Sequence, residues 1–321
     1  MNIGFASYVA RRLVVAVVLL LIISFAIFSL LHVAPGDPIQ ALIGVGDAPS
    51  PETVRLLREQ YNLDLPFLEQ YWLWLQDAIR LDFGESITTH QSVTETIMQR
   101  LPVTLFLGTY AFVLTMTFGI GLGILAAVKR RSVLDRGLVA GVVLGVSTPA
   151  FVTGILLLYF FSVTLPWFPS FGAGSGFLDR LWHLTLPAIA MAVGDTALIL
   201  KHTRASMINV VDQDYVTFAR ARGLSASRVL YMYALRNALI PVITVSGFLL
   251  SFLLTSAVLV EITFSLSGIG GTLVNSATAK DIPLLQGVAL LVAAMIILGT
   301  LLADLAYMAV DPRIRIGGRT R

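Results

Sequence analysis

The sequence predicts an all-α membrane protein with six transmembrane helices and a partly helical external region between the first two. Three observations support this fold class. Hydrophobic residues make up 56% of the 321 residues and charged residues only 13%, whereas soluble globular chains carry about 25% charged residues. Six apolar runs reach or exceed the roughly 20 residues that cross a bilayer. Lysine and arginine residues gather on alternate segments between these runs, as in multi-span proteins.

The predicted spans define the organisation of the chain. They cover residues 12–31, 102–128, 137–163, 184–203, 237–263 and 283–310. The first follows Arg11 and Arg12 and is interpreted as a retained anchor. A cleaved signal peptide is the alternative, but the apolar run is long for one. The predicted units are residues 1–31 (N-terminus and first helix), 32–101 (external region), 102–310 (five-helix core containing loop 204–236) and 311–321 (tail).

Basic residues orient the chain. With six spans both termini share one side, and 16 of the 22 lysine and arginine residues lie on that side. The positive-inside rule holds for short loops, and without the long segment 32–101 only Arg180 and Lys280 are left on the other side. Both termini are therefore expected in the cytoplasm.

The segment 32–101 is expected to be external and structured. It carries ten acidic residues against four arginines, a net charge of −6. Residues 65–81 have the helical spacing of an amphipathic helix with an aromatic face, made by Phe67, Tyr71, Trp72, Leu75 and Ile79. This helix is expected to rest on the membrane surface as a small cap, or to serve as a docking surface or gate for an external partner, and the two roles are compatible.

The most patterned polar stretch lies within loop 204–236. The i, i+3, i+4, i+7 spacing of one helix face is shared by Tyr215, Phe218, Ala219 and Arg222. Asp212 or Asp214 is expected to cap its start, Gly223 to end it in the left-handed region, and Ser225 to cap the next helix. A short helix between two spans indicates contact with a partner protein. The alternative is an interfacial helix on anionic lipid.

Acidic side chains inside spans are costly and point to function. Asp195 lies mid-span, where it either makes a structural polar pair or lines a hydrated cavity. Glu261, near the outer end of its span, either lines the pathway too or simply reaches the membrane interface. Asp304, near the inner end of the last span, is expected to pair with Arg313 or Arg315.

Glycine and proline residues predict how the spans pack and bend. Small residues four apart allow close helix approach, within the chain or against a second subunit: Gly119 and Gly123, and Gly137, Gly141 and Gly145. Prolines are expected at helix starts, where a missing N–H costs nothing, or further inside, where they predict kinks. The first group is Pro102, Pro241 and Pro283, and the second is Pro149 and Pro187.

Several chemistries lack a motif in this sequence. There is no cysteine, the four histidines are scattered, and no phosphate-binding G-x-x-x-x-G-K-[ST] pattern occurs. The glycine cluster at 268–271 is interpreted as a turn. Neither a metal site nor a nucleotide site is expected, so ATP-driven transport would need a separate ATPase chain.

Motifs along nearly the whole chain resemble one family. They are YVARR (8–12), PGDP (35–38), LDFGES (81–86), RLPVTL (100–105), DYVTFARARGL (214–224), LRNALIP (235–241) and DPRIR (311–315). In this order, in a six-span protein, they resemble the permease subunits of binding-protein-dependent ABC importers of the type I fold, in the peptide and nickel branch (the dipeptide/oligopeptide permease type). Of the general E-A-A loop signature only Ala219 matches, and Pro241 follows Gly223 by eighteen residues. Both departures are typical of that branch.

The resemblance implies a function and partners. The chain would be a non-catalytic subunit of a bacterial inner-membrane importer. It would form the pathway for peptides with a second permease subunit, two ABC ATPase domains and an external substrate-binding protein. ATP and Mg²⁺ would be bound by the ATPases, and this chain would hold no cofactor. Related permeases also serve nickel complexes, glutathione and opines. The alternatives are a self-sufficient secondary transporter or channel, and a membrane scaffold that transports nothing.

The resemblance also assigns a coupling helix at about 213–223. This helix would lie in a groove of the ATPase and pass on its closure to the spans. Its expected contact residues are Asp214, Tyr215, Phe218, Ala219, Arg220, Arg222, Gly223 and Leu224.

Overall fold

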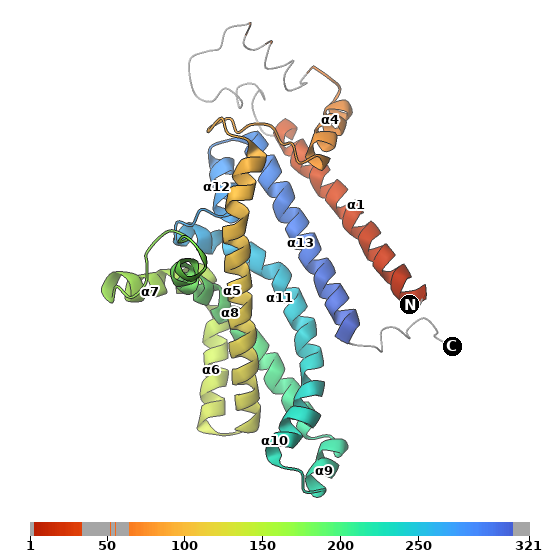
Figure 1. Cartoon of the computed structure of the whole chain (residues 1–321), viewed down its shortest axis with the longest axis vertical. Coiled ribbons are helices and arrows are strands. Elements are labelled where there is room, and N and C mark those ends of the chain that lie inside the picture. Colours follow the sequence, from red (N-terminus) through yellow and green to blue (C-terminus); the bar gives the residue numbers. More distant parts are fainter. Residues whose placement is uncertain (1–2, 34–51, 53–54, 56–63, 311–321) are drawn as a thin grey trace.

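The computed structural model describes residues 3–33, 52, 55 and 64–310. Within these residues the regular secondary structure is helical, joined by turns and loops, and one isolated bridge pairs Glu85 with Ser92. Figure 1 shows long helices running side by side, and five are long and apolar enough to cross a membrane. These spans lie in α1 (Ile3–Val33), α5 (Val93–Val128), α8 (Phe177–Val211), α11 (Arg236–Thr263) with the turns before it, and α13 (Ile282–Val310).

The third predicted span, 137–163, is broken at the position where Pro149 predicted a kink. It consists of α6 (Val133–Ser147), then α7 (Ala150–Leu157) with the π-helical η1 (Leu158–Thr164), and the two parts are bent by 104°. Thr148 is extended in front of Pro149, because the proline ring disfavours helical geometry in the residue before it. Six spans result if the bent pair counts as one. Pro187, in contrast, lies inside the uninterrupted α8.

Two helices begin earlier in the sequence than predicted. α5 begins at Val93 rather than at residue 102, because Ser92 accepts a hydrogen bond from the Glu95 amide at 3.4 Å and caps the helix. Pro102 is therefore inside the helix. α8 begins at Phe177 and ends at Val211, well beyond the predicted 184–203. Pro241 also lies inside its helix, whereas Pro283 is at the start of α13 as expected.

Glycines bring α5 and α6 against α8. A Cβ atom added at Gly123 would lie 2.5 Å from the Thr203 Cβ, and one at Gly145 would lie 3.2 Å from the Ala197 Cβ. Packing within the chain is therefore confirmed for these two positions and for Gly119, which lies against Ile199. Gly137 and Gly141 of α6 differ, because a Cβ at either would meet nothing within 4 Å.

Short helices mark the two ends of the bundle (Figure 1). At one end, here called the α4 end, lie α4 (Phe67–Ile79) and α12 (Ile269–Thr278). α4 confirms the amphipathic helix predicted at 65–81. α12 was not predicted, since the cluster at 268–271 was interpreted as a turn and instead begins this helix. At the opposite end, the α9 end, lie α9 (Asp214–Ala221), α10 (Ala226–Arg228) and the π-helical η2 (Val229–Leu235), which leads into α11.

Candidate functional site

The short helix α9 is anchored through one side only. Val216 and Ala219 are buried and pack with Val229 at the start of η2. Ala219 therefore belongs to the anchored side, which corrects the predicted face that grouped it with the exposed residues. Val216 was not singled out from the sequence, although a valine beside Ala219 on a short helix is a usual packing signal. This contact fixes α9 to the helix that enters the membrane as α11.

The ends of α9 are only partly as predicted. Neither aspartate caps its start, because the N-cap is Gln213, Asp214 is the first helical residue, and Asp212 pairs with Arg130 at 3.2 Å. Gly223 does adopt the expected left-handed conformation, with φ +75°. Its amide donates to the Arg220 carbonyl at 2.9 Å, and a side chain at this position would be strained.

The opposite side of α9 is exposed and carries aromatic and basic groups. Phe218 is 69% exposed, which leaves a large apolar side chain with little cover. Tyr215 is also exposed, and its hydroxyl accepts a hydrogen bond from the Asn237 amide group at 3.3 Å. Arg220 and Arg222 are exposed, while Leu224 is half-buried just after the helix. An exposed phenylalanine beside arginines suits a protein groove better than water.

The α9 end is held by a continuous connection from α9 into α11 and by an ion pair between two other helices, α8 and α6. Ser225 caps α10 as predicted, accepting from the Arg228 amide at 3.4 Å, and α10, η2 and α11 then continue without a break. In addition, Arg204 of α8 donates two hydrogen bonds to the buried Asp135 of α6, at 2.6 and 2.8 Å. Sequence reasoning missed Asp135, although the Ser132-x-x-Asp135 capping pattern was available as a signal. At the α9 end, apolar packing therefore holds α9 against η2, and a bidentate ion pair holds α8 against α6.

Asp195 lies halfway along α8. Its side chain is half-buried, and within the described residues it has neither a hydrogen-bond donor nor an ion-pair partner. The structural polar pair, one of the two alternatives given for Asp195, is therefore not formed among these residues. A lone carboxylate at this depth favours hydrated surroundings or a partner outside this chain.

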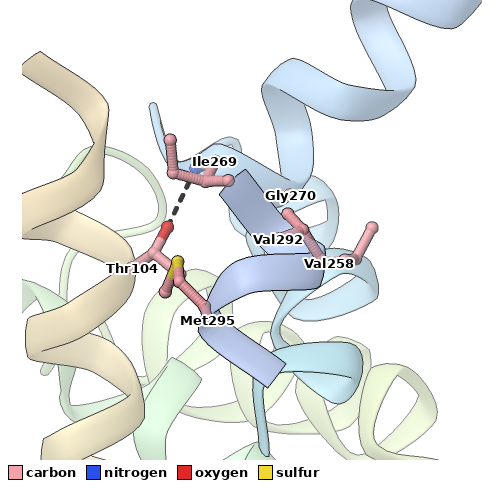
Figure 2. Close-up of a pocket in the computed structure, with 6 residues that line it drawn as sticks. All are labelled: Thr104, Val258, Ile269, Gly270, Val292 and Met295. Carbon is pink, nitrogen blue, oxygen red and sulfur yellow. Dashed lines mark hydrogen bonds between the residues drawn. The ribbon is translucent and has the colours of Figure 1, made fainter. Parts of the chain in front are cut away.

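Glu261 is fully buried and does not reach the interface, so that alternative was wrong. Its carboxylate accepts hydrogen bonds from the Thr104 hydroxyl at 2.5 Å and the Gly271 amide at 3.0 Å. The Thr104 hydroxyl in turn accepts from the Ile269 amide at 2.8 Å (Figure 2). A carboxylate at the first turn of a helix compensates its free N–H groups and its dipole. Glu261 thus joins α11, α5 and the start of α12.

The glycines at 268–271 make room for this carboxylate. A Cβ atom added at Gly268 would lie 2.3 Å from a Glu261 oxygen, and one at Gly270 would lie 2.6 Å from the Val258 Cα. Beside this cluster is a small pocket, drawn in Figure 2, with one polar and five apolar lining residues: Thr104, Val258, Ile269, Gly270, Val292 and Met295. Its position, between helices that pack tightly, indicates a packing gap rather than a substrate site.

Asp304 forms an ion pair with Arg12 at 3.0 Å, which joins α13 to α1. The predicted partners Arg313 and Arg315 lie outside the described residues. The expectation that Asp304 forms an ion pair is therefore confirmed. Its partner in the structure is Arg12 of the first span.

A second buried carboxylate at the α4 end, Asp281, was missed in the sequence. It precedes α13 and accepts hydrogen bonds from the hydroxyls of Ser86 and Thr88, at 2.5 and 2.7 Å, and from the amide of Ile87 at 3.3 Å. Burial alone would raise the pKa of Asp281, but these hydrogen bonds together hold the pKa below its usual value. Asp281 therefore fixes the loop at 84–92 to the α12–α13 connection.

Asp281 is expected to make this attachment sensitive to acid. Because its folded-state pKa is lowered, its stabilisation is complete above the unfolded pKa of ~3.9 and is lost as the pH falls through the lower folded pKa. Limited proteolysis of the loop at 84–92 should therefore accelerate below about pH 4. Asp281→Asn should be cleaved quickly at every pH, since its amide cannot accept from all three donors. A loop that is equally resistant at pH 3 and pH 7 would contradict the expectation.

Comparisons with known proteins are consistent with this arrangement. Residues 119–316 match the family described as binding-protein-dependent transport system inner membrane component, and residues 5–108 match its N-terminal family. A putative peptide transport system permease protein of Brucella abortus is 40% identical over 313 residues, which is 96% of this chain and 99% of that protein. A glutathione transport system permease protein of Escherichia coli is 37% identical over 310 residues, with the same shares.

The fold is also shared with a solved structure. A chain of the MetNI methionine ABC transporter, in an inward-facing conformation, matches with a TM-score of 0.55 and 17% identity. The match covers 67% of this chain and 96% of that chain. At this identity the likeness supports the fold alone, that of a type I ABC importer permease.

Proposed function

This chain belongs to the family of binding-protein-dependent transport system inner membrane components, and on that premise we propose that it forms an import pathway for peptides. It is a multi-pass membrane protein and a permease subunit of an ABC importer. Family membership decides against a self-sufficient secondary transporter or channel. The observation that supports a peptide substrate is the 40% identity, over 96% of the chain, to a relative named as a peptide permease.

A subunit of such an importer works with an ATPase and a substrate-binding protein. We propose a second, homologous permease subunit and two ATPase domains, with α9 seated in a groove of one ATPase. The exposed Phe218 would supply the apolar contact, and Val216 and Ala219 would transmit movement to η2 and α11. Transmission requires an element that both sites bias, and a helix fixed to a span on one side and open on the other fits this need.

We further propose that the chain is non-catalytic and holds no cofactor, with ATP and Mg²⁺ bound by the ATPase. The location would be the bacterial inner membrane, with the α9 end and both termini in the cytoplasm. The excess of basic residues on that side supports this orientation. Asp195 is our candidate for the translocation pathway because it is half-buried and lacks a partner among the described residues. Glu261 is already satisfied by Thr104 and α12, so a structural role suits it better.

The substrate is tested with the complete importer in liposomes. ATP hydrolysis and uptake are measured with its binding protein and four ligands in turn: an α-linked dipeptide, an α-linked pentapeptide, glutathione and a nickel chelate. Stimulation of both by either α-linked peptide is the expected result. Glutathione is the matched control, because its first peptide bond runs through a side-chain carboxyl group. Stimulation by glutathione alone, or by the nickel chelate alone, would overturn the peptide proposal and leave the importer assignment intact.

A further inference from the structure

The helix α4 is attached to α1 below the end of the apolar span. The span in α1 runs from Ser7 to Ser29, and the Tyr71 hydroxyl forms a hydrogen bond with the Ser24 hydroxyl at 2.9 Å. With a rise of about 1.5 Å per residue, Ser24 is about 7.5 Å along the helix axis from the last residue of the span. Figure 1 shows α4 beside this part of α1.

Aromatic rings make this attachment firm. Phe25 of α1 lies edge-to-face with Phe67 and Tyr71 of α4, with ring centroids 5.7 and 5.1 Å apart. Phe28 also contacts both rings and the ring of Trp74 at 5.6 Å. Such pairs stabilise the contact beyond what the buried apolar area contributes. The depth of α4 relative to α1 is therefore fixed by the chain itself.

A second apolar stripe on α4 has no cover within the described residues. Leu68, Trp72 and Ile79 are 67%, 59% and 74% exposed. Their spacing of four and seven residues places them on one face of the helix. This stripe adjoins the side that packs on α1, whose own residues exposed at this level, such as Ile22 and Phe25, belong to the span. The charged residues Glu69, Asp77 and Arg80 lie on the remaining exposed side.

We propose that the stripe of Leu68, Trp72 and Ile79 is a lipid-binding surface, so that α4 lies in the membrane interface with these three side chains among the acyl chains. Continuity with the exposed apolar surface of α1, and attachment about 7.5 Å along α1 from the end of its apolar span, support lipid as the occupant. Interfacial helices bury their apolar faces ~5–10 Å into the boundary of headgroups and acyl chains, and tryptophan prefers this level. The binding protein would then meet the charged side of α4 and not this stripe.

The absence of cysteine makes a direct test possible. Single variants Leu68→Cys, Trp72→Cys and Ile79→Cys carry a nitroxide label in the complete importer, with partner cysteines replaced, in phosphatidylcholine liposomes. Glu69→Cys and Asp77→Cys are matched controls on the charged side. Collision rates with oxygen, which concentrates in lipid, and with a water-soluble nickel chelate are measured by electron paramagnetic resonance.

At the three stripe positions the collision rate with oxygen is expected to exceed the collision rate with the chelate. At the two control positions the chelate should collide more often than oxygen. Strong collisions with the chelate at 68, 72 and 79 would show a stripe facing water and overturn the proposal. Weak collisions with both reagents would show cover by protein, from another chain of the importer or the binding protein, and would overturn it equally.

Discussion

Phe218→Asp is expected to abolish uptake by the assembled importer while the chain still inserts in the membrane. The side chain is 69% exposed and makes no part of the anchored side of α9, so the change leaves the contacts of Val216 and Ala219 intact. Burying a phenylalanine against a partner contributes about 1.5–3 kcal/mol, and an unpaired carboxylate in its place adds a desolvation cost. The affinity for the ATPase should therefore fall at least about tenfold.

The measurement is a pull-down of the tagged chain in mild detergent, scored for vanadate-sensitive ATPase activity and paired with peptide uptake. Ser227→Asp is the matched control, because it adds the same charge to an exposed position of the same loop outside α9. The control should retain both activities, and Phe218→Leu should fall between it and Phe218→Asp. Wild-type ATPase recovery with Phe218→Asp would place the ATPase contact elsewhere.

Much of the fold is predictable because each span is a local pattern. Apolar runs and basic flanks are read from neighbouring residues, so five spans and α4 were placed correctly from the sequence, and only their ends were displaced. The start of α5 was missed although Ser92-x-x-Glu95 is a usual N-terminal signal. The break after Ser147 was less visible, since a proline inside a span is compatible with a mild kink or with the 104° bend that occurs.

The polar contacts between helices could not be predicted in the same way. Asp281 meets Ser86 and Thr88 across more than 190 residues of sequence, and no local spacing indicates that pairing. Asp304 similarly pairs with Arg12, at the other end of the chain. A charged residue in an apolar run indicates that the charge needs a partner. Which residue becomes that partner depends on how the helices pack. The helix α9 could be predicted more readily from the sequence, because its exposed face and the glycine that ends it both belong to one short segment.

Glu261→Gln is the change at the α4 end with the largest expected effect on stability. The carboxylate can only accept hydrogen bonds, and it accepts them from the Thr104 hydroxyl and the Gly271 backbone amide. A glutamine amide keeps one acceptor and turns an NH₂ group toward donors, so at least one buried donor loses its partner. Each such loss costs about 1–3 kcal/mol. In detergent, Glu261→Gln should unfold at a clearly lower temperature than Glu95→Gln, which makes the same change at an exposed position of α5.

A second variant separates this contact from a general effect of mutation. Gly268→Ala keeps the carboxylate but places a Cβ atom 2.3 Å from its oxygen, so the cap must shift. Because both changes disrupt one contact, their combination should destabilise by less than the sum of the single effects. Strict additivity, or melting of Glu261→Gln at the temperature of Glu95→Gln, would show that the cap on α12 contributes nothing.

The same variant also distinguishes the two ends of the molecule. Glu261 lies at the α4 end, whereas α9 lies at the opposite end of α11 (Figure 1). A loosened α12 should therefore lower peptide uptake without releasing the ATPase, which Phe218→Asp should release. Loss of both activities with Glu261→Gln would mean that the whole bundle unfolds. Loss of uptake with ATPase recovery intact would mean that import depends on a fixed α12 independently of the attachment at α9.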